Sequence, residues 1–238
     1  MFYMNNNKLP FLLVTSVLLS GACCLNKQSL IYENNYIRPV VCLGDSITSG
    51  YNISGDEKDN SDLAYPAIIQ KWVNIPVINM GVSGDTTRDA LYRLNRDVIS
   101  KNPRIVIIFL GINDIFNDYD YWFTENNFNI IVSNLTEEDR KIYIVKFLPD
   151  DVIRWNLEQR GKNPEEQDYI IDLYNKLFQN LQENFYIEII ENIWDNIWQV
   201  HTPDGLHPDS KGHKIMGERI YKIIKPYLKK IKINRRGS

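Results

Sequence analysis

The sequence predicts an α/β protein, a three-layer α/β/α sandwich built around a five-stranded parallel sheet. From residue 38 onward, short apolar runs rich in β-branched residues alternate with amphipathic segments of helical period, which is the pattern of repeated βαβ units. The apolar runs are nearly continuous, as expected of parallel strands that helices cover on both faces. Because crossovers between parallel strands are right-handed, the expected strand order is flavodoxin-like.

Each element has a signal of its own. The expected strands are apolar runs at 39–43, 77–79, 105–110, 142–147 and 186–190. The expected helices lie between and after them, at 64–73, 87–100, 124–135, 165–183 and 210–231. Thr86 and Asp89 are spaced as a capping box, and Asp209 precedes the last helix as a cap. No boundary is visible inside this pattern, so residues 37–238 are expected to form one domain.

Composition excludes some classes of function. A formal net charge of −3 argues against nucleic acid as the main partner, because phosphate binding requires a basic face. The three cysteines stand at positions 23, 24 and 42, and Cys42 lies in the first expected strand. We therefore expect a buried thiol at Cys42 and no disulfide framework.

Residues 1–22 have the features of a signal peptide of the lipoprotein type. Lys8 precedes an apolar run at 9–19 that is too short to span a bilayer comfortably but suits a signal peptide. Small residues then end at Cys23, a pattern that resembles a bacterial lipobox and implies cleavage before Cys23 and lipidation of its thiol. Residues 23–36 would form a polar tether, so a lipid anchor would hold the protein at a membrane of the cell envelope. The alternative is plain secretion, into the periplasm or the medium, with cleavage nearby.

A candidate nucleophile follows the first strand. The apolar run breaks at Gly44 into Asp45 and Ser46, and open α/β sheets bind their ligands at the carboxyl ends of the strands. A serine is a poor nucleophile unless a neighbouring base takes its proton, so Ser46 needs a histidine. The sequence contains no Gly-x-Ser-x-Gly motif, which disfavours an ordinary α/β-hydrolase.

The base is sought among only three histidines. His213 lies inside the last helix, where a surface or packing role is expected, and His201 has no motif around it. His207 has Asp204 three residues before it, in a tight Asp-Gly-Leu-His turn. A carboxylate there can accept the Nδ1 proton and leave Nε2 facing Ser46, although Asp204 and the glycine after it could also form nothing more than a turn.

Donors for a developing oxyanion are expected in the loops after the next strands. The backbone N–H groups of Ser46 and Gly81 and the side-chain amide of Asn113 could converge at one point. Gly81 could also serve only as a tight turn and Asn113 only as a loop cap. Asp45 and Asp114 are expected to brace their loops by hydrogen bonds.

Four blocks carry these residues, at 40–51, 79–86, 111–114 and 204–208, and together they resemble the GDSL/SGNH hydrolases, a superfamily of serine esterases and lipases. The stretches 65–70, 76–87 and 94–103 are similar to its bacterial acyl-CoA thioesterase/lysophospholipase/arylesterase branch. The resemblance implies the fold expected above and a Ser46–His207–Asp204 triad. It further implies an oxyanion hole of Ser46, Gly81 and Asn113, with no cofactor and no metal.

The resulting hypothesis is a serine esterase that hydrolyses a lysophospholipid, a short acyl ester or a thioester through an acyl-enzyme on Ser46. A carbohydrate O-acetylesterase of the same fold is the main alternative. A metal-dependent phosphoesterase would use Asp45, Asp114, Asp204 and His207 as ligands. A surface-anchored binding lipoprotein without turnover is the alternative from outside the enzymes.

Two further segments could lie near the site. Residues 150–167 form a long connection that could act as a lid. Aromatic residues follow Asn113 closely, and we expect them to pack a short helix onto the core rather than to line an acyl groove or face a membrane. They are Phe116, Tyr119, Tyr121, Trp122 and Phe123.

Overall fold

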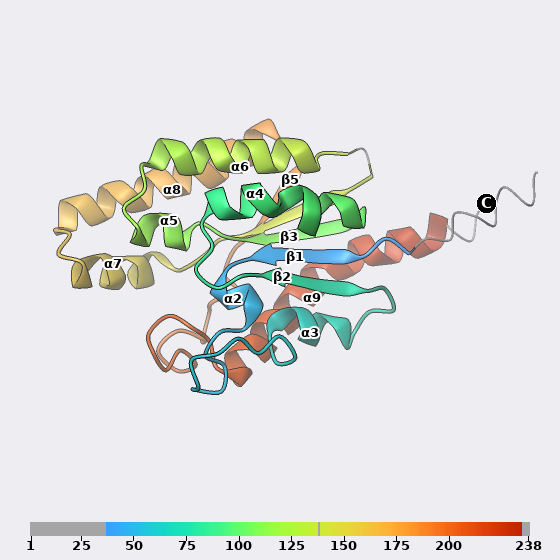
Figure 1. Cartoon of the computed structure of the whole chain (residues 1–238), viewed down its shortest axis with the longest axis horizontal. Helices are drawn as coiled ribbons and strands as arrows, with labels where there is room; N and C mark the ends of the chain where they lie inside the picture. Colours follow the sequence, from blue (N-terminus) through green and yellow to red (C-terminus); the bar gives the residue numbers. More distant parts are fainter. Residues whose placement is uncertain (1–36, 138, 235–238) are drawn as a thin grey trace, which may run out of the picture. The chain divides into compact units, whose positions relative to one another are not determined.

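The computed structural model describes residues 37–137 and 139–234, so the expected signal peptide, Cys23 and the tether lie outside the described residues. Five strands form one parallel sheet in the order β2-β1-β3-β4-β5 (Figure 1), which is the flavodoxin-like order expected from the sequence. The strands are β1 (Val40–Gly44), β2 (Val77–Gly81), β3 (Ile105–Phe109), β4 (Lys141–Val145) and β5 (Ile187–Ile190).

Helices cover both faces of the sheet and complete three layers. Helices α4, α6 and α8 lie on one face, and α3 and α9 lie against each other on the opposite face (Figure 1). The helices are α2 (Ser46–Ser49), α3 (Tyr65–Gln70), α4 (Thr87–Asp97), the 3₁₀ helix η2 (Ile99–Lys101), α5 (Ile112–Phe116), α6 (Tyr121–Leu135), α7 (Asp150–Gln159), α8 (Pro164–Asn184) and α9 (Ser210–Asn234).

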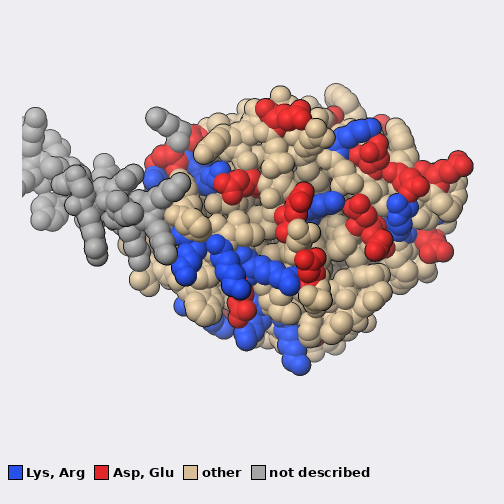
Figure 2. Space-filling model, turned by 180° about the vertical axis from the view of Figure 1, so that it is seen from behind, with Lys and Arg blue, Asp and Glu red and all other residues tan. Residues whose placement is uncertain are grey.

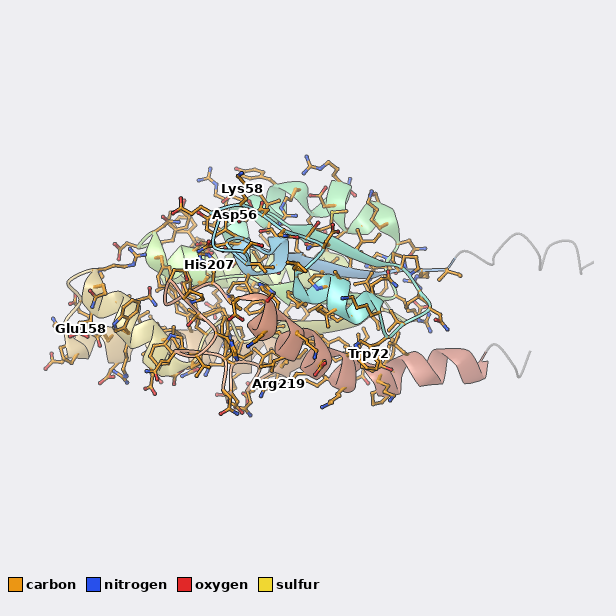
Figure 3. The ribbon with its side chains drawn as sticks, turned by 90° about the horizontal axis from the view of Figure 1, so that it is seen from below. Asp56, Lys58, Trp72, Glu158, His207 and Arg219 are labelled. Atoms are coloured by element: carbon orange, nitrogen blue, oxygen red, sulfur yellow. The ribbon has the colours of Figure 1, made fainter. Side chains whose placement is uncertain are left out.

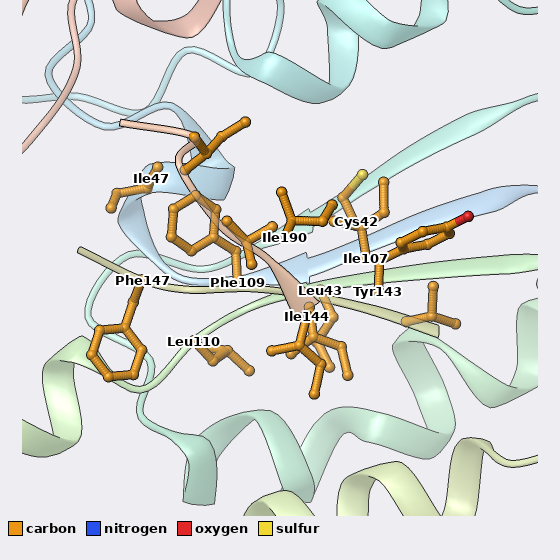
Figure 4. Packing of buried hydrophobic residues seen from close by; sticks show 14 of the residues in the cluster. Cys42, Leu43, Ile47, Ile107, Phe109, Leu110, Tyr143, Ile144, Phe147 and Ile190 are labelled. Carbon is orange, nitrogen blue, oxygen red and sulfur yellow. The ribbon is translucent and has the colours of Figure 1, made fainter. Parts of the chain in front are cut away.

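The core lies on both sides of the three central strands, β1, β3 and β4, which are buried along their whole length. Side chains alternate between the faces, with Cys42 and Tyr143 on one side and Leu43 and Ile144 on the other (Figure 4). Each fully buried large apolar side chain contributes roughly 1.5–3 kcal/mol. This double coverage is why the apolar runs are continuous in sequence. Cys42 is a buried free thiol, as expected.

Two helices near the carboxyl ends of the strands, α2 and α7, were not expected. The short helix expected at the aromatic residues after Asn113 corresponds to α5, which ends at Phe116. The capping box of Thr86 and Asp89 at the start of α4 is present as expected. Helix α7 occupies part of the connection at 150–167, and its Val152, Ile153 and Leu157 are buried in the core. This part of the connection is thus a helix packed on the core rather than an open loop.

The aromatic cluster after Asn113 divides into two groups. Phe116 and Tyr121 pack against the core as expected. Tyr119, Trp122 and Phe123 are instead 42–60% exposed, because they lie on the solvent side of the turn into α6 and of its first residues.

Charged side chains are unevenly distributed over the surface. On the face shown in Figure 2, Lys and Arg gather toward one end, and Asp and Glu predominate toward the other. The small net charge of the chain is therefore an average over regions of opposite charge. No helix among the described residues has the length and hydropathy needed to cross a membrane.

Candidate active site

The expected site residues converge beyond the carboxyl end of β1. Asp45 caps the short helix α2 by accepting a hydrogen bond from the Ile47 N–H (3.0 Å), and Ser46 is the first residue of that helix. Ser46 is 8% exposed. Because the first N–H groups of a helix have no intrahelical acceptor, the Ser46 N–H is left available.

Ser46, His207 and Asp204 form one chain of hydrogen bonds. His207 Nε2 lies 3.0 Å from Ser46 Oγ, and His207 Nδ1 lies 2.8 Å from Asp204 Oδ2. With the Nδ1 proton donated to the carboxylate, Nε2 is the acceptor that faces the serine hydroxyl. The ring of Tyr51 packs edge-on against the imidazole at a centroid distance of 4.9 Å and helps to fix its orientation.

Asp204 is held as a carboxylate by the donors around it. Oδ1 accepts from the N–H groups of Leu206 (3.0 Å) and His207 (2.7 Å), and Oδ2 also accepts from Asn52 Nδ2 (2.9 Å). Partial burial alone would raise the pKa of Asp204, but these hydrogen bonds outweigh it and lower the pKa to about 2. The role of Asn52 had no signal in the sequence, because Asn52 lies far from Asp204 along the chain.

The other two histidines have different surroundings. His201 Nδ1 lies 3.1 Å from Asp209 Oδ2, in front of α9. His213 is completely buried inside α9, where its Nδ1 accepts from the Tyr65 N–H (3.2 Å). Burial lowers the pKa of His213 to about 3, so its ring is neutral. His213 is a packing residue rather than a surface one, and neither histidine is bonded to Ser46.

Asp45 has an unusual environment for an acidic residue. It is fully buried, and its Oδ2 atom has no hydrogen-bond partner among the described residues. Burial raises the pKa of Asp45 to about 7, and the nearby carboxyl groups of Asp85 and Asp114 add to this effect. Asp45 therefore braces α2, as expected, and keeps its proton to a higher pH than an ordinary aspartate does.

Asn113 lies in α5, directly after β3. Its Nδ2 donates to the backbone oxygen of Asp85 (2.9 Å), which orients the amide and leaves its second N–H for another acceptor. Asp114 accepts from the N–H (2.9 Å) and the hydroxyl (2.5 Å) of Thr87, as expected of a residue that braces the loop. Burial raises the pKa of Asp114 above its usual value.

Gly81 lies at the end of β2, but its N–H donates to Asn79 Oδ1 (2.9 Å). A Cβ at this position would lie 2.1 Å from Ser49 N, so the glycine is required by its contact with α2. Gly84, three residues later, lies on the surface with φ +84°, and a Cβ added there would meet no atom within 4 Å. Its N–H donates no hydrogen bond within residues 37–137 and 139–234. As an oxyanion donor, Gly81 stays a prediction that requires its bond to Asn79 to break.

Arg93 connects the ends of β1 and β2 and the loop that follows β2 by hydrogen bonds to their backbone and side-chain oxygens. Its buried guanidinium donates to Asp85 Oδ2 (2.5 Å) and to the backbone oxygens of Met80 (2.8 Å) and Gly44 (2.9 Å). One buried cation thus bonds to the end of β1, to the end of β2 and to the loop that leads into α4. An arginine in a helical pattern reads as a surface residue, so the sequence carried no signal for this role.

Helix α7 and the turn at 204–207 border a cavity of about 330 Å³ beside His207 that is widely open to solvent. In Figure 3, His207 lies between the loop that carries Asp56 and Lys58 and the helix that carries Glu158. The cavity is lined by Trp155, Asn156, Gln159, Arg160, Asp204, Leu206 and His207.

The arrangement pairs a serine hydroxyl with an oriented base and places spare N–H donors nearby, which is the geometry of nucleophilic acyl transfer. A metal-dependent phosphoesterase would instead need Asp45, Asp114, Asp204 and His207 to be grouped around one point. Within the described part of the chain, no three His, Cys, Asp or Glu side chains are grouped so that they could hold a metal ion.

Known proteins resemble this chain over most of its length. The family model described as GDSL-like lipase/acylhydrolase matches residues 42–215. An arylesterase of Vibrio mimicus is 28% identical over 82% of this chain and 90% of its own. An acetylxylan esterase of Geobacillus stearothermophilus is 27% identical over 64% of this chain and 73% of its own. The thioesterase/protease/lysophospholipase of Escherichia coli is 23% identical over 79% and 83%.

Two further matches bear on location and fold. A protein of Bacillus subtilis described as an uncharacterized lipoprotein is 38% identical over 34% of each chain. The crystal structure of a lipase/acylhydrolase from Enterococcus faecalis superposes with a TM-score of 0.60 at 26% identity, over 80% of this chain and 96% of its own.

Proposed function

Because this chain belongs to the GDSL-like lipase/acylhydrolase family and is a serine ester hydrolase, we propose that it cleaves carboxylic acyl esters through an acyl-enzyme on Ser46. The observation that carries this mechanism is the unbroken chain of hydrogen bonds from Ser46 Oγ through the His207 ring to Asp204. Each of its two links has the length expected of a bond that transfers or orients a proton.

The reaction would proceed in two steps. Ser46 Oγ attacks the acyl carbon while its proton passes to His207 Nε2, and the leaving alcohol or thiol then takes that proton as its bond to the acyl carbon breaks. Water repeats the sequence on the acyl-enzyme: it gives a proton to Nε2 and its oxygen to the acyl carbon, which releases the acid and restores Ser46. Asp204 remains a carboxylate and keeps the Nδ1 proton in place.

The oxyanion would be held by the Ser46 N–H, the free N–H of the Asn113 amide, and a third donor from the loop after β2. Gly84 is the better candidate for this donor than Gly81. The Gly81 N–H is already bonded to Asn79, whereas Gly84 is exposed and its N–H donates no hydrogen bond within the described residues. Each such donor contributes about a hundred- to a thousandfold to kcat.

The proposed substrates are short acyl esters, lysophospholipids or thioesters. Acetylated carbohydrates are a second candidate, favoured by one feature of the cavity beside His207. There the indole of Trp155 and the amides of Asn156 and Gln159 offer an apolar surface together with hydrogen-bonding groups, a combination that suits a sugar ring. The similarity to an acetylxylan esterase agrees with this alternative.

Purified residues 24–238 should hydrolyse p-nitrophenyl acetate and react once with a fluorophosphonate probe, at Ser46. Ser46→Ala should lose both activities, and His207→Ala should lose nearly all turnover, whereas His201→Ala should stay within a fewfold of wild type. Labelling of a different serine would overturn the assignment of the nucleophile. A folded protein that hydrolyses no ester and takes up no probe would instead support the binding lipoprotein.

We further propose that the chain is anchored through a lipid on Cys23. The lipobox-like sequence supports this proposal, and so does the similarity of part of the chain to a protein described as a lipoprotein. Expressed with its own leader in a bacterium, the protein should incorporate labelled palmitate. Cys23→Ser should abolish that incorporation, and the matched change Cys24→Ser should not. Incorporation that depends on Cys24 would move the site by one residue.

A further inference from the structure

The cavity beside His207 contains a cation that has no carboxylate partner among the described residues. Lys146, Arg154 and Lys162, the other cations on or next to α7, form ion pairs with Asp150, Asp168 and Asp118. Arg160, at the end of α7, forms none within the described residues, and its guanidinium makes no hydrogen bond there. It lies instead over the face of the Phe116 ring, at 4.5 Å from the centroid.

That contact orients Arg160 without using its hydrogen-bonding capacity. A guanidinium stacked on an aromatic ring keeps its N–H groups at the edge of the stack, where they can reach an anion. Phe116 belongs to α5, the same short helix as Asn113. Arg160 is therefore held between the helix that carries an oxyanion donor and the cavity that His207 lines.

Among the described residues that line the cavity, only Asp204 is acidic, and its oxygens are already occupied. They accept hydrogen bonds from Asn52, from the His207 ring and from the N–H groups of Leu206 and His207. Apart from Arg160, the other lining residues are Trp155, Asn156, Gln159, Leu206 and His207, and none of them is acidic. Within this part of the chain, the charge of Arg160 is thus left without a protein partner. The cavity volume, about 330 Å³, falls in the range of small-ligand sites.

We infer that the ester substrate carries an anionic group, a phosphate or a carboxylate, which Arg160 binds in this cavity. The inference rests on the proposed esterase function and names the class of ester. A guanidinium presents two parallel N–H groups that match two oxygens of either anion. Gln159, which also lines the cavity and whose side chain makes no hydrogen bond within the described residues, supplies a further amide donor. The anion can belong to the alcohol or to the acyl part of the ester.

Two substrate pairs that differ in charge test the inference and distinguish these two sources. Decanoyl glycerophosphate and monodecanoylglycerol place the charge on the alcohol. The p-nitrophenyl esters of succinate and of acetate place it on the acyl group. Wild type should have the higher kcat/KM for the charged member of one pair, and added salt should reduce that preference because it screens the attraction.

Arg160→Gln should lower kcat/KM for that charged ester by about tenfold to a hundredfold, mainly through KM, and leave its neutral counterpart within about twofold. Arg160→Lys should retain part of the preference, because a lysine keeps the charge but not the planar pair of donors. The matched control is Arg154→Gln, on the same helix but paired with Asp168 and outside the cavity lining. It should change neither pair.

The outcomes separate the inference from the proposed function. If wild type hydrolyses p-nitrophenyl acetate but prefers neither charged ester, the inference is wrong and the esterase assignment stands. The same holds if Arg160→Gln, with an unchanged circular dichroism spectrum, affects charged and neutral esters equally. If no ester is hydrolysed and Ser46 takes up no probe, the proposed function fails, and the inference fails with it.

Discussion

Replacing Asp204 by Asn should nearly abolish turnover because it reverses one hydrogen bond. Oδ1 accepts from two backbone N–H groups, at 3.0 and 2.7 Å, so the new side chain keeps its carbonyl oxygen there. Its NH₂ group then takes the place of Oδ2 and faces His207 Nδ1. Two donors cannot share a bond, so the imidazole adopts the tautomer that points an N–H at Ser46.

In that tautomer His207 cannot accept the Ser46 proton. The same change in a Ser-His-Asp triad lowers kcat about ten-thousandfold, which corresponds to about 5 kcal/mol in the free energy of the transition state. The cost in folding stability should be far smaller. The new NH₂ group also faces Asn52 Nδ2, which donates to Oδ2 at 2.9 Å in the wild type, and one lost hydrogen bond costs about 1 kcal/mol.

Steady-state hydrolysis of p-nitrophenyl acetate measures the first effect and thermal unfolding the second. The matched control is Asp209→Asn, because Asp209 contacts His201 Nδ1 in the same way but outside the triad. That variant should keep its kcat within a fewfold of wild type. If Asp204→Asn retains a tenth or more of wild-type kcat, the imidazole is not oriented by this carboxylate and the reasoning is refuted.

Four further substitutions address the surroundings of the triad. Asn113→Ala should lower kcat about a hundredfold or more with little change in KM, and steady-state kinetics that show a raised KM and normal kcat would assign the amide to ground-state binding. Burial raises the pKa of Asp45 from 3.8 to about 7, so its contribution to stability is complete at acidic pH and is lost as the pH rises through the folded-state pKa. Asp45→Asn should therefore make the unfolding free energy, measured by urea titration, decline less steeply from acidic to alkaline pH. If the decline is as steep as in wild type, it does not come from Asp45. Gly81→Ala should lower the melting temperature strongly, because its Cβ would lie 2.1 Å from Ser49 N. The Cβ of Gly84→Ala meets no neighbouring atom, so this variant should lose only the about 1–2 kcal/mol that a positive φ costs an alanine. Similar melting temperatures of the two variants would contradict this difference in packing.

The strands and the triad could be predicted because each has a local signal. Buried parallel strands are apolar along their length, and that property is visible in the sequence whatever the strand order. Ser46 follows such a strand, and its base had to be one of three histidines, of which only His207 has an aspartate in an adjacent turn. Helix α7 had only a partial signal. Acidic residues after Pro149 are typical of a helix start, but the residues that hold the helix, Val152, Ile153 and Leu157, reveal their role only once they are buried.

The proposed oxyanion donors show why a sequence motif is less informative than the contacts made in the folded protein. Gly81 and Gly84 lie in one short block, and nothing in the block says which N–H is free. The answer depends on Asn79, whose side chain accepts the Gly81 N–H at 2.9 Å while donating to the Thr48 oxygen at 2.7 Å. These contacts exist only after β2 has paired with β1 and brought α2 alongside. Asn52 and Arg160 were missed for the same reason, since their partners are distant in sequence.

Arg93 indicates that the separate sequence blocks of the site act as one unit. Its guanidinium holds the Gly44 oxygen just before the nucleophile, the Met80 oxygen at the end of β2, and the Asp85 carboxylate. The backbone oxygen of the same Asp85 accepts a hydrogen bond from the Asn113 amide. The positions of the proposed nucleophile and of a proposed oxyanion donor therefore both depend on one buried cation. A lysine could not replace Arg93, because a single ammonium group cannot reach all the acceptors that the planar, forked guanidinium group reaches. Residues that share such a network couple energetically, so substitutions in different blocks should have effects on kcat that do not add.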